Sequence, residues 1–204
     1  MLVVGLTGNY GMGKSSVLSI FAALGAFTLD SDGIVEFFLC RTDVRDKIRN
    51  LLGNEAFCKN GSINKKMVAE LIFNNGTLRR SLEDMLHPLV LERINHILKD
   101  KKMEYKVAVV EVPLLFEGGY ENRFDRTATV FTSSEMAIDR LKQKGIDRGD
   151  ALLRMGYQLP IGEKVRRSDF AIDNNGPIEE TEKKVHLLYE RLLKEAELEN
   201  NQRD

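Results

Sequence analysis

The residues best suited to chemistry stand near the N-terminus, in the stretch GNYGMGKS at residues 8–15. Its glycines allow a tight backbone turn in which successive N–H groups point toward one anion. Lys14 adds a mobile positive charge suited to the β- and γ-phosphates, and the hydroxyl of Ser15 is a ligand for Mg²⁺. The spacing therefore predicts a phosphate loop that binds a nucleoside triphosphate with magnesium. The alternative is an ordinary glycine-rich turn between a strand and a helix.

Asp30 and Asp32 form the second candidate group. They follow a short apolar run at residues 26–29, which we interpret as a strand. In open parallel sheets, ligands bind at the carboxyl ends of the strands, which is also where the phosphate loop must lie. A carboxylate at that edge can orient an acceptor hydroxyl and receive its proton, and we favour Asp32 for that role. The alternative is that Asp32 only caps the next helix.

These groups need a scaffold that brings strand ends together. The chain has 204 residues, of which 43% are hydrophobic and 30% charged, which suits one globular domain with a buried core. Short apolar runs alternate with helical stretches, a pattern typical of an α/β fold with a parallel sheet between helices. The helix after the phosphate loop is expected to stop at Gly25, and the last helix to begin at Pro177. We predict five strands, at residues 2–7, 26–29, 106–112, 127–132 and 169–172.

Two longer segments interrupt this pattern. Residues 34–102 are helical in pattern and too long for a plain crossover, so we predict a helical insertion that binds the acceptor. A proline inside a helix costs about 3 kcal/mol, so one helix is expected to end at His87 and another to begin at Pro88. Eight Lys and Arg against three Asp and Glu over residues 140–167 predict a basic lid. The predicted division is a core at 1–33, 103–133 and 168–195, the insertion at 34–102, the lid at 134–167, and a polar tail at 196–204 that frays.

Other nucleotide-binding classes fit less well. A GTPase would carry NKxD after a later strand, whereas the Asn64-Lys65 pair leads into Met67 and lies in the insertion. A motor ATPase would usually end the corresponding strand in Asp or Asp-Glu, and here the strand continues through Glu111 to Pro113. These differences favour a small kinase with an insertion and a lid, an arrangement that closes over two substrates and excludes water.

Net charge and cysteine content limit the classes of binding partner and the cellular compartment that we expect for this protein. A formal net charge of −1 is too balanced for a protein that grips a nucleic-acid backbone over a broad face. The alternative is that residues 140–167 bind RNA. Single-stranded RNA is usually bound by aromatic residues interleaved with basic ones, and this segment contains only one aromatic residue, Tyr157. Cys40 and Cys58 are too few for a zinc site or a disulfide framework. The apolar run at the N-terminus is far shorter than the ~20 residues of a membrane span, so we expect a cytoplasmic protein without membrane or nucleic-acid partners.

Several distinctive stretches follow one another over roughly residues 1–193: the phosphate loop, Asp30-Ser31-Asp32, His87-Pro88-Leu89, PLLFE at 113–117, Gln158, Asp169 and IDNNG at 172–176. His-Pro together with PLLFE is far more restrictive than a phosphate loop alone. In their order and at similar intervals, these stretches resemble those of a known family, the dephospho-coenzyme A kinases. The chain departs from the family pattern at Ser16, Glu36 and Lys144, where Thr, a basic residue and Arg are common.

The resemblance implies a P-loop kinase fold and transfer of the ATP γ-phosphoryl group to the ribose 3′-hydroxyl of dephospho-coenzyme A. The products are coenzyme A and ADP, in the final step of coenzyme A synthesis. Asp32 would hold the acceptor hydroxyl, and Arg140 would fold from the lid onto the migrating charge. Asn174 lies where a base-reading loop stands in this fold, although its plainer meaning is a turn. ATP would bind through Gly8, Gly11, Met12, Gly13, Lys14, Ser15 and Ser16, with Mg²⁺ on Ser15.

The predicted contacts with dephospho-coenzyme A have plainer alternatives. In the alternative interpretation, His87 only closes a helix, and Arg140 is a solvated helix residue without a catalytic role. Leu115 and Phe116 then fill the core. Two other functions stay open, namely a different small-molecule kinase and a regulator whose loop senses ATP without transferring phosphate. The predicted acceptor contacts are Asp32, His87, Leu115, Phe116 and Glu117.

Overall fold

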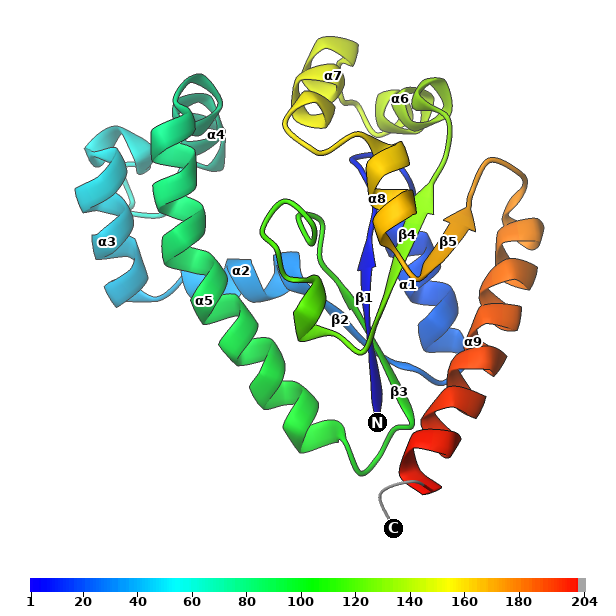
Figure 1. Ribbon diagram of the computed structural model, residues 1–204. Coiled ribbons are helices and arrows are strands. Elements are labelled where there is room, and N and C mark those ends of the chain that lie inside the picture. The colour runs from blue at the N-terminus through cyan, green and yellow to red at the C-terminus, as the bar shows by residue number, and fades with distance from the viewer. Residues whose placement is uncertain (202–204) are drawn as a thin grey trace. The chain divides into compact units, whose positions relative to one another are not determined.

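The computed structural model describes residues 1–201 and contains a five-stranded sheet in which all paired strands are parallel. The strand order is β2-β3-β1-β4-β5 (Figure 1). The predicted sheet is confirmed, with each strand end within one residue of its predicted position. The strands are β1 (Leu2–Thr7), β2 (Phe27–Asp30), β3 (Val107–Glu111), β4 (Arg126–Phe131) and β5 (Phe170–Asp173).

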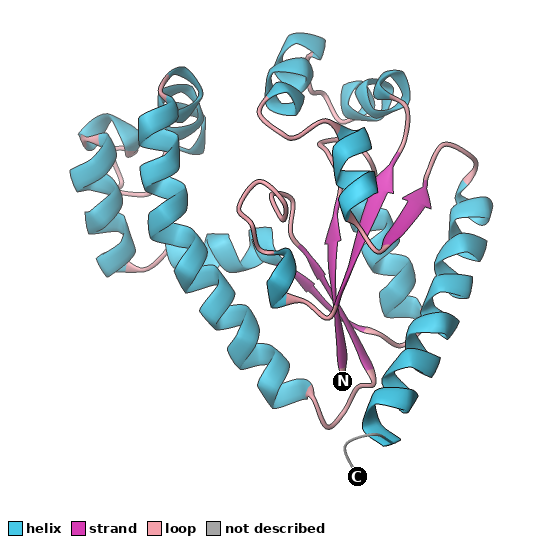
Figure 2. Cartoon of the chain, viewed as in Figure 1, coloured by secondary structure: helices cyan, strands magenta, loops and turns pink. Residues whose placement is uncertain are grey.

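One face of the sheet carries the main core. Successive residues of a strand point to opposite faces, so Val4 and Leu6 share a face, and there they meet α1 (Lys14–Ala23) and α9 (Ile178–Asn201). Burial of apolar surface stabilises this packing by roughly 25 cal/mol per Å². Gly25, at φ +100°, ends α1 as predicted. Figure 2 shows the strands in magenta and the helices in cyan.

The residues after β4 form three short helices. The last of them, α8, packs on β4, where Thr129 Oγ1 donates a hydrogen bond to Lys164 O over 3.3 Å. The predicted lid extends to Arg167, whereas this helix is part of the packed layers. The helices are α6 (Ser134–Gln143), α7 (Arg148–Gly156) and α8 (Ile161–Arg167), and a 3₁₀ turn, η2 (Glu121–Arg123), precedes β4.

The chain divides into two compact units, one of Met1–Asp30 with the chain from Asp100 onward, the other of Ser31–Lys99. In the second unit, the Asn64 side chain accepts a hydrogen bond from Met67 N over 3.2 Å and caps a helix. The Asn64-Lys65 pair, compared above with a GTPase motif, therefore lies at the N-terminus of a helix, where Asn64 is the cap. The elements of this unit are α2 (Ser31–Leu39), α3 (Thr42–Leu52), the 3₁₀ turn η1 (Asn54–Ala56), α4 (Lys65–Asn74) and most of α5 (Gly76–Lys101).

The predicted helix break at His87 is wrong. Pro88 lies inside α5, which runs through it without interruption. Proline has no N–H for the carbonyl four residues earlier, so one helical hydrogen bond is lost. The apolar residues on one face of α5 are buried on both sides of Pro88, and their burial offsets that loss. The buried residues are Leu82, Leu86, Val90, Ile94 and Leu98.

The C-terminal helix is longer than predicted. Residues 196–201 were expected in a polar tail, but they continue α9, with Ala196 buried and Glu195 3.0 Å from Arg126 Nε. Ile178, the first residue of α9, is 45% exposed. The rest of the predicted tail, 202–204, lies outside the described residues. Among the described residues, no helix combines the length and the apolar character needed to span a bilayer.

Candidate active site

The phosphate loop joins β1 to α1, as predicted. Gly8 at φ +150° and Gly13 at φ +89° adopt backbone conformations that other residues avoid. A Cβ on Gly8 would lie 2.3 Å from Val130 O, and one on Gly13 would lie 2.2 Å from Asn174 Nδ2. Both positions therefore require glycine for conformational and for steric reasons. The loop ends at the N-terminus of α1, where unpaired N–H groups and the helix dipole favour an anion.

Lys14, the first residue of α1, has an almost completely buried side chain. Its Nζ donates a hydrogen bond to Asn9 O over 3.4 Å and lies 3.8 Å from Glu111 Oε1. Glu111 ends β3 and is itself only 5% exposed, so the two charges balance each other in a site of low polarity. The sequence interpretation did not assign Glu111 a role. The signal was an acidic residue at the end of an otherwise apolar strand.

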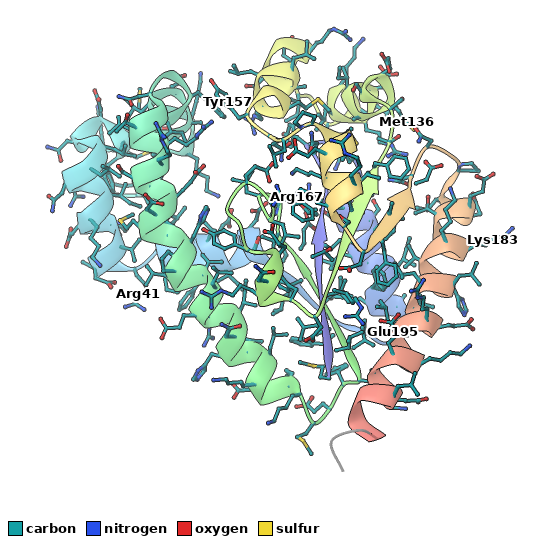
Figure 3. All side chains as sticks on the ribbon, in the orientation of Figure 1. Arg41, Met136, Tyr157, Arg167, Lys183 and Glu195 are labelled. Atoms are coloured by element: carbon teal, nitrogen blue, oxygen red, sulfur yellow. The ribbon has the colours of Figure 1, made fainter. Side chains whose placement is uncertain are left out.

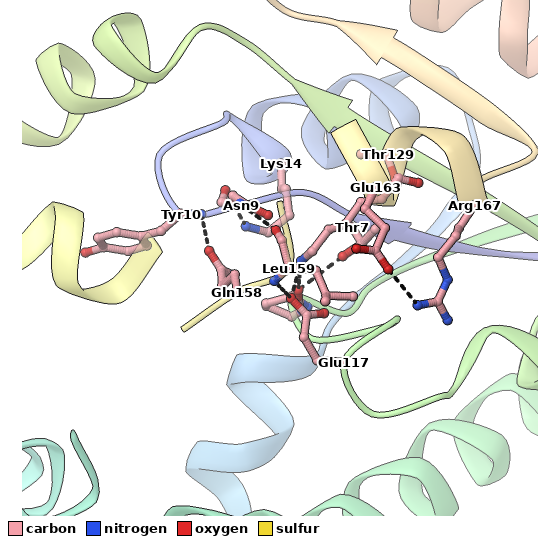
Figure 4. Close-up of polar contacts among 12 residues, drawn as sticks. Thr7, Asn9, Tyr10, Lys14, Glu117, Thr129, Gln158, Leu159, Glu163 and Arg167 are labelled. Carbon is pink, nitrogen blue, oxygen red and sulfur yellow. Dashed lines mark hydrogen bonds and ion pairs between the residues drawn. The ribbon is translucent and has the colours of Figure 1, made fainter. Parts of the chain in front are cut away.

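A second buried lysine lies near the first. Lys164 Nζ is 2.8 Å from Glu117 Oε1 and 3.0 Å from Pro113 O, which also accepts a hydrogen bond from Thr7 Oγ1 (Figure 4). Burial lowers the pKa of Lys164, and the carboxylate of Glu117 opposes that shift. Lys164, counted among the basic residues of the predicted lid, is thus paired inside the protein. Contact of Glu117 with substrate stays a prediction.

Asn174 braces the phosphate loop from the β5–α9 connection. Its Nδ2 donates a hydrogen bond to Met12 O, and its Oδ1 accepts one from Thr181 Oγ1, each over 2.9 Å. Both ends of the amide are thus engaged within the protein, and Asn174 is 3% exposed. These contacts favour a supporting role and lend no weight to the prediction that this side chain reads the base.

Arg140 reaches the same side of the loop from α6. Its Nη2 donates a hydrogen bond to Asn174 O over 3.0 Å. Its Nη1 is buried, has no hydrogen-bond partner among the described residues, and lies 3.4 Å from the place of a Cβ on Gly13. Buried N–H groups nearly always have a partner, so a guanidinium nitrogen held beside an anion-binding loop is suited to a phosphate oxygen.

Ser15 and Ser16 stand in the first turn of α1 and are exposed. Among the described residues, no group of three or more His, Cys, Asp or Glu is placed to hold a metal ion.

The other predicted substrate contacts belong to both units of the chain. Leu115 is fully buried and Phe116 is 4% exposed, under the guanidinium of Arg167, so both pack inside their unit. Asp32 is exposed in the first turn of α2. His87 lies on α5, where burial lowers its pKa. Their approach to the phosphate loop stays a prediction.

Part of the positive charge of the predicted lid, residues 134–167, is compensated. Arg167 pairs with Glu121 and lies 3.7 Å from Glu163 Oε1, while Arg154 Nη2 lies 3.1 Å from Asp150 Oδ2. Figure 3 shows the side chains of these helices and labels Arg167. Asp150 and Glu163 are already among the three acidic residues counted for 140–167, whereas Glu121 and Glu117, which pair with Arg167 and Lys164, lie outside that stretch and lower its positive charge beyond the count.

A parallel sheet with a Gly-x-x-x-x-Gly-Lys-Ser loop between its first strand and first helix defines the P-loop nucleotide-binding proteins. Within that class, the family model described as dephospho-CoA kinase matches residues 2–180. The chain therefore belongs to the dephospho-CoA kinase family, and the resemblance drawn from the sequence is confirmed.

Individual relatives agree with this placement. The dephospho-CoA kinase of Aquifex aeolicus is 34% identical over 193 residues, which cover 94% of this chain and 98% of that protein. The crystal structure of TT1252 from Thermus thermophilus has a TM-score of 0.79 and 28% identity, covering 94% of this chain and 97% of that one. Dephospho-CoA kinase from Campylobacter jejuni shares the fold, with a TM-score of 0.68 and 24% identity over 94% of this chain and 97% of that one.

Proposed function

We propose that this chain transfers the γ-phosphoryl group of ATP to the ribose 3′-hydroxyl of dephospho-coenzyme A. The products are coenzyme A and ADP, in the final step of coenzyme A biosynthesis. Membership of the dephospho-CoA kinase family supports both substrates. The observation that carries the proposal is that two cationic groups, Lys14 Nζ and Arg140 Nη1, border one glycine loop at a helix N-terminus.

ATP is proposed to bind on the loop. The backbone N–H groups from Gly11 to Ser16 would hold the β- and γ-phosphates, while Gly8 sets the turn. Lys14 would follow the γ-phosphate as a point charge. Its present hydrogen bond to Asn9 O is long at 3.4 Å, so exchanging it for a phosphate oxygen costs little.

Magnesium suits these donors. Mg²⁺ in phosphoryl-transfer sites is usually held by one or two protein oxygens together with phosphate oxygens and water, and Ser15 offers one exposed hydroxyl beside the loop. Bound there, the metal would neutralise negative charge on the β- and γ-phosphates.

Asp32 is proposed to orient the acceptor hydroxyl and to take its proton. It follows Asp30, the last residue of β2, which pairs in register with Glu111, and Glu111 contacts Lys14. As the ribose 3′-oxygen bonds to the γ-phosphorus, the bond between that phosphorus and the ADP oxygen breaks. The hydroxyl proton passes to the Asp32 carboxylate.

Arg140 is proposed to stabilise the charge that moves onto ADP. The transition state of phosphoryl transfer is loose, so the protein mainly positions the reacting oxygens and neutralises charge. The hydrogen bond from Arg140 Nη2 to Asn174 O holds the guanidinium in place and leaves Nη1 to donate to a phosphate.

A panel of acceptors tests this function. The protein is incubated with ATP, Mg²⁺ and, separately, dephospho-coenzyme A, nucleoside monophosphates and shikimate, and ADP is measured. We expect ADP release only with dephospho-coenzyme A. Release with another acceptor would indicate a different kinase on this scaffold, and ATP binding without acceptor-dependent release would indicate a nucleotide-sensing regulator.

We also propose a cytoplasmic enzyme that works on small molecules, without membrane or nucleic-acid partners. Cys40 and Cys58 are both unpaired and exposed, which suits a reducing compartment.

A further inference from the structure

The connection between α7 and α8, residues 157–160, is hydrogen-bonded to the start of the phosphate loop. The Tyr10 N–H donates to Gln158 Oε1 over 2.7 Å, and Asn9 Nδ2 donates to Leu159 O over 3.1 Å (Figure 4). Two successive residues of the connection thus hold two successive residues of the loop. Neither Gln158 nor Leu159 has a role in the site as described above.

The connection is itself anchored. The Leu159 N–H donates to Glu117 Oε1 over 2.9 Å, and the same oxygen lies 2.8 Å from Lys164 Nζ. Because Lys164 is buried in α8, the residues that grip the loop are tied to a packed helix on one side. A connection anchored in this way can hold the phosphate loop in one conformation, whereas an unanchored surface connection could not.

The lid helix α7 adds a third contact. The Arg154 guanidinium lies 5.2 Å from the centroid of the Tyr10 ring, and its Nη1 reaches Tyr10 Oη over 3.5 Å. Tyr10 is therefore held through its backbone N–H by Gln158 and through its ring by Arg154.

The held residues lead directly to the donor-binding groups. Asn9, which bonds Leu159 O through its side chain, also accepts a hydrogen bond from Lys14 Nζ through its carbonyl. A loop presents its N–H groups to phosphate effectively only when its backbone is already in the binding conformation.

From these contacts we infer that Gln158 is a positioning residue for the phosphate donor. It accepts the Tyr10 N–H, and with Leu159 it holds the first half of the phosphate loop in the conformation that binds ATP. This inference rests on the proposed kinase function and deepens its donor side.

The variant Gln158→Met tests the inference, because methionine is of similar length and lacks a strong acceptor for the Tyr10 N–H. ATP binding is measured by calorimetry with Mg²⁺, and the KM for each substrate by ADP release. We expect the Kd and KM for ATP to rise about tenfold, the loss typical of one such hydrogen bond. The KM for dephospho-coenzyme A should change less than twofold. Exchange of the Tyr10 amide proton with solvent, followed by NMR, should become faster.

Gln143→Met is the matched control, since Gln143 is exposed at the end of α6, and it should leave every value unchanged. Asn9→Leu removes the other hydrogen bond to the connection and should also weaken ATP binding alone, so it decides the question if Gln158→Met fails to fold. Wild-type Kd and KM for ATP in both variants would overturn the inference, as would an equal rise in both KM values. A wild-type protein that binds no ATP would instead refute the proposed function.

Discussion

The ammonium group of Lys164 lies 2.8 Å from the carboxylate of Glu117, and the lysine side chain has no exposed surface. The pair joins α8 to the segment after β3. Taking both charges out of water is costly, and the site compensates with further hydrogen bonds to Pro113 O and from Leu159 N. This ion pair therefore depends on both partners being present.

Removing one partner should destabilise the fold strongly. Lys164→Met leaves the Glu117 carboxylate in a poorly hydrated site, and we expect the free energy of unfolding to fall by about 3 kcal/mol, the low end for a buried pair because Glu117 keeps some exposure. Urea unfolding measures this loss. The double variant Lys164→Met/Glu117→Gln, which removes both charges, should recover part of it. Equal stability of Lys164→Met and the wild type would show that the pair contributes nothing.

Lys14→Ala tests the phosphate loop. A hydrogen bond from a charged donor to phosphate is worth about 1.5–3 kcal/mol, so kcat/KM for ATP should fall by roughly 10- to 100-fold, with weaker ATP binding. Lys142→Ala, at an exposed position on α6, is the control and should behave as the wild type. Unchanged kinetics in Lys14→Ala would remove the argument for a phosphate loop.

Asp32→Asn tests the acceptor side. Loss of a positioned base should lower kcat by roughly 10²- to 10⁴-fold while ATP affinity stays nearly intact. Steady-state kinetics and calorimetry separate the two quantities. Asp43→Asn, which removes the acidic residue in the first turn of α3 together with its exposed ion pair to Arg41, controls for the loss of a carboxylate at a helix N-terminus. Normal turnover in Asp32→Asn would reduce Asp32 to a structural residue of α2.

The lowered pKa of His87 predicts that the protein loses stability in mild acid. Burial lowers its pKa from the ordinary 6.5, and nearby Asp84 only partly opposes the shift. Between the lowered pKa and 6.5 the unfolded chain binds more protons than the folded one, so stability rises with pH and is lost as pH falls below about 6.5.

Urea unfolding between about pH 7.5 and about pH 5.5 should show a steeper loss for the wild type than for His87→Gln. His96→Gln, at an exposed position on the same helix, controls for the replacement of a histidine on α5. Identical slopes for the wild type and His87→Gln would contradict the prediction.

Patterns within short stretches of sequence predicted the strands and the phosphate loop, because the conformation of these elements depends mainly on neighbouring residues in the chain. The central strands β1 and β3 are almost wholly apolar because both of their faces are covered, and the phosphate loop is set by glycines at positive φ directly after β1. The break at Pro88 failed because a local penalty was weighed without the buried face of α5, which lies on both sides of the proline.

Residue types and spacing were enough to predict the α/β class, the phosphate loop with Lys14 and Ser15, and the resemblance to the dephospho-CoA kinases. Three contacts could be found only in the folded chain, namely Lys164 with Glu117, Asn174 with Met12 and Gln158 with Tyr10. These partners are tens to more than a hundred residues apart in the chain. No spacing rule relates such residues, because packing of helices onto the sheet, not chain connectivity, brings their side chains within hydrogen-bonding distance.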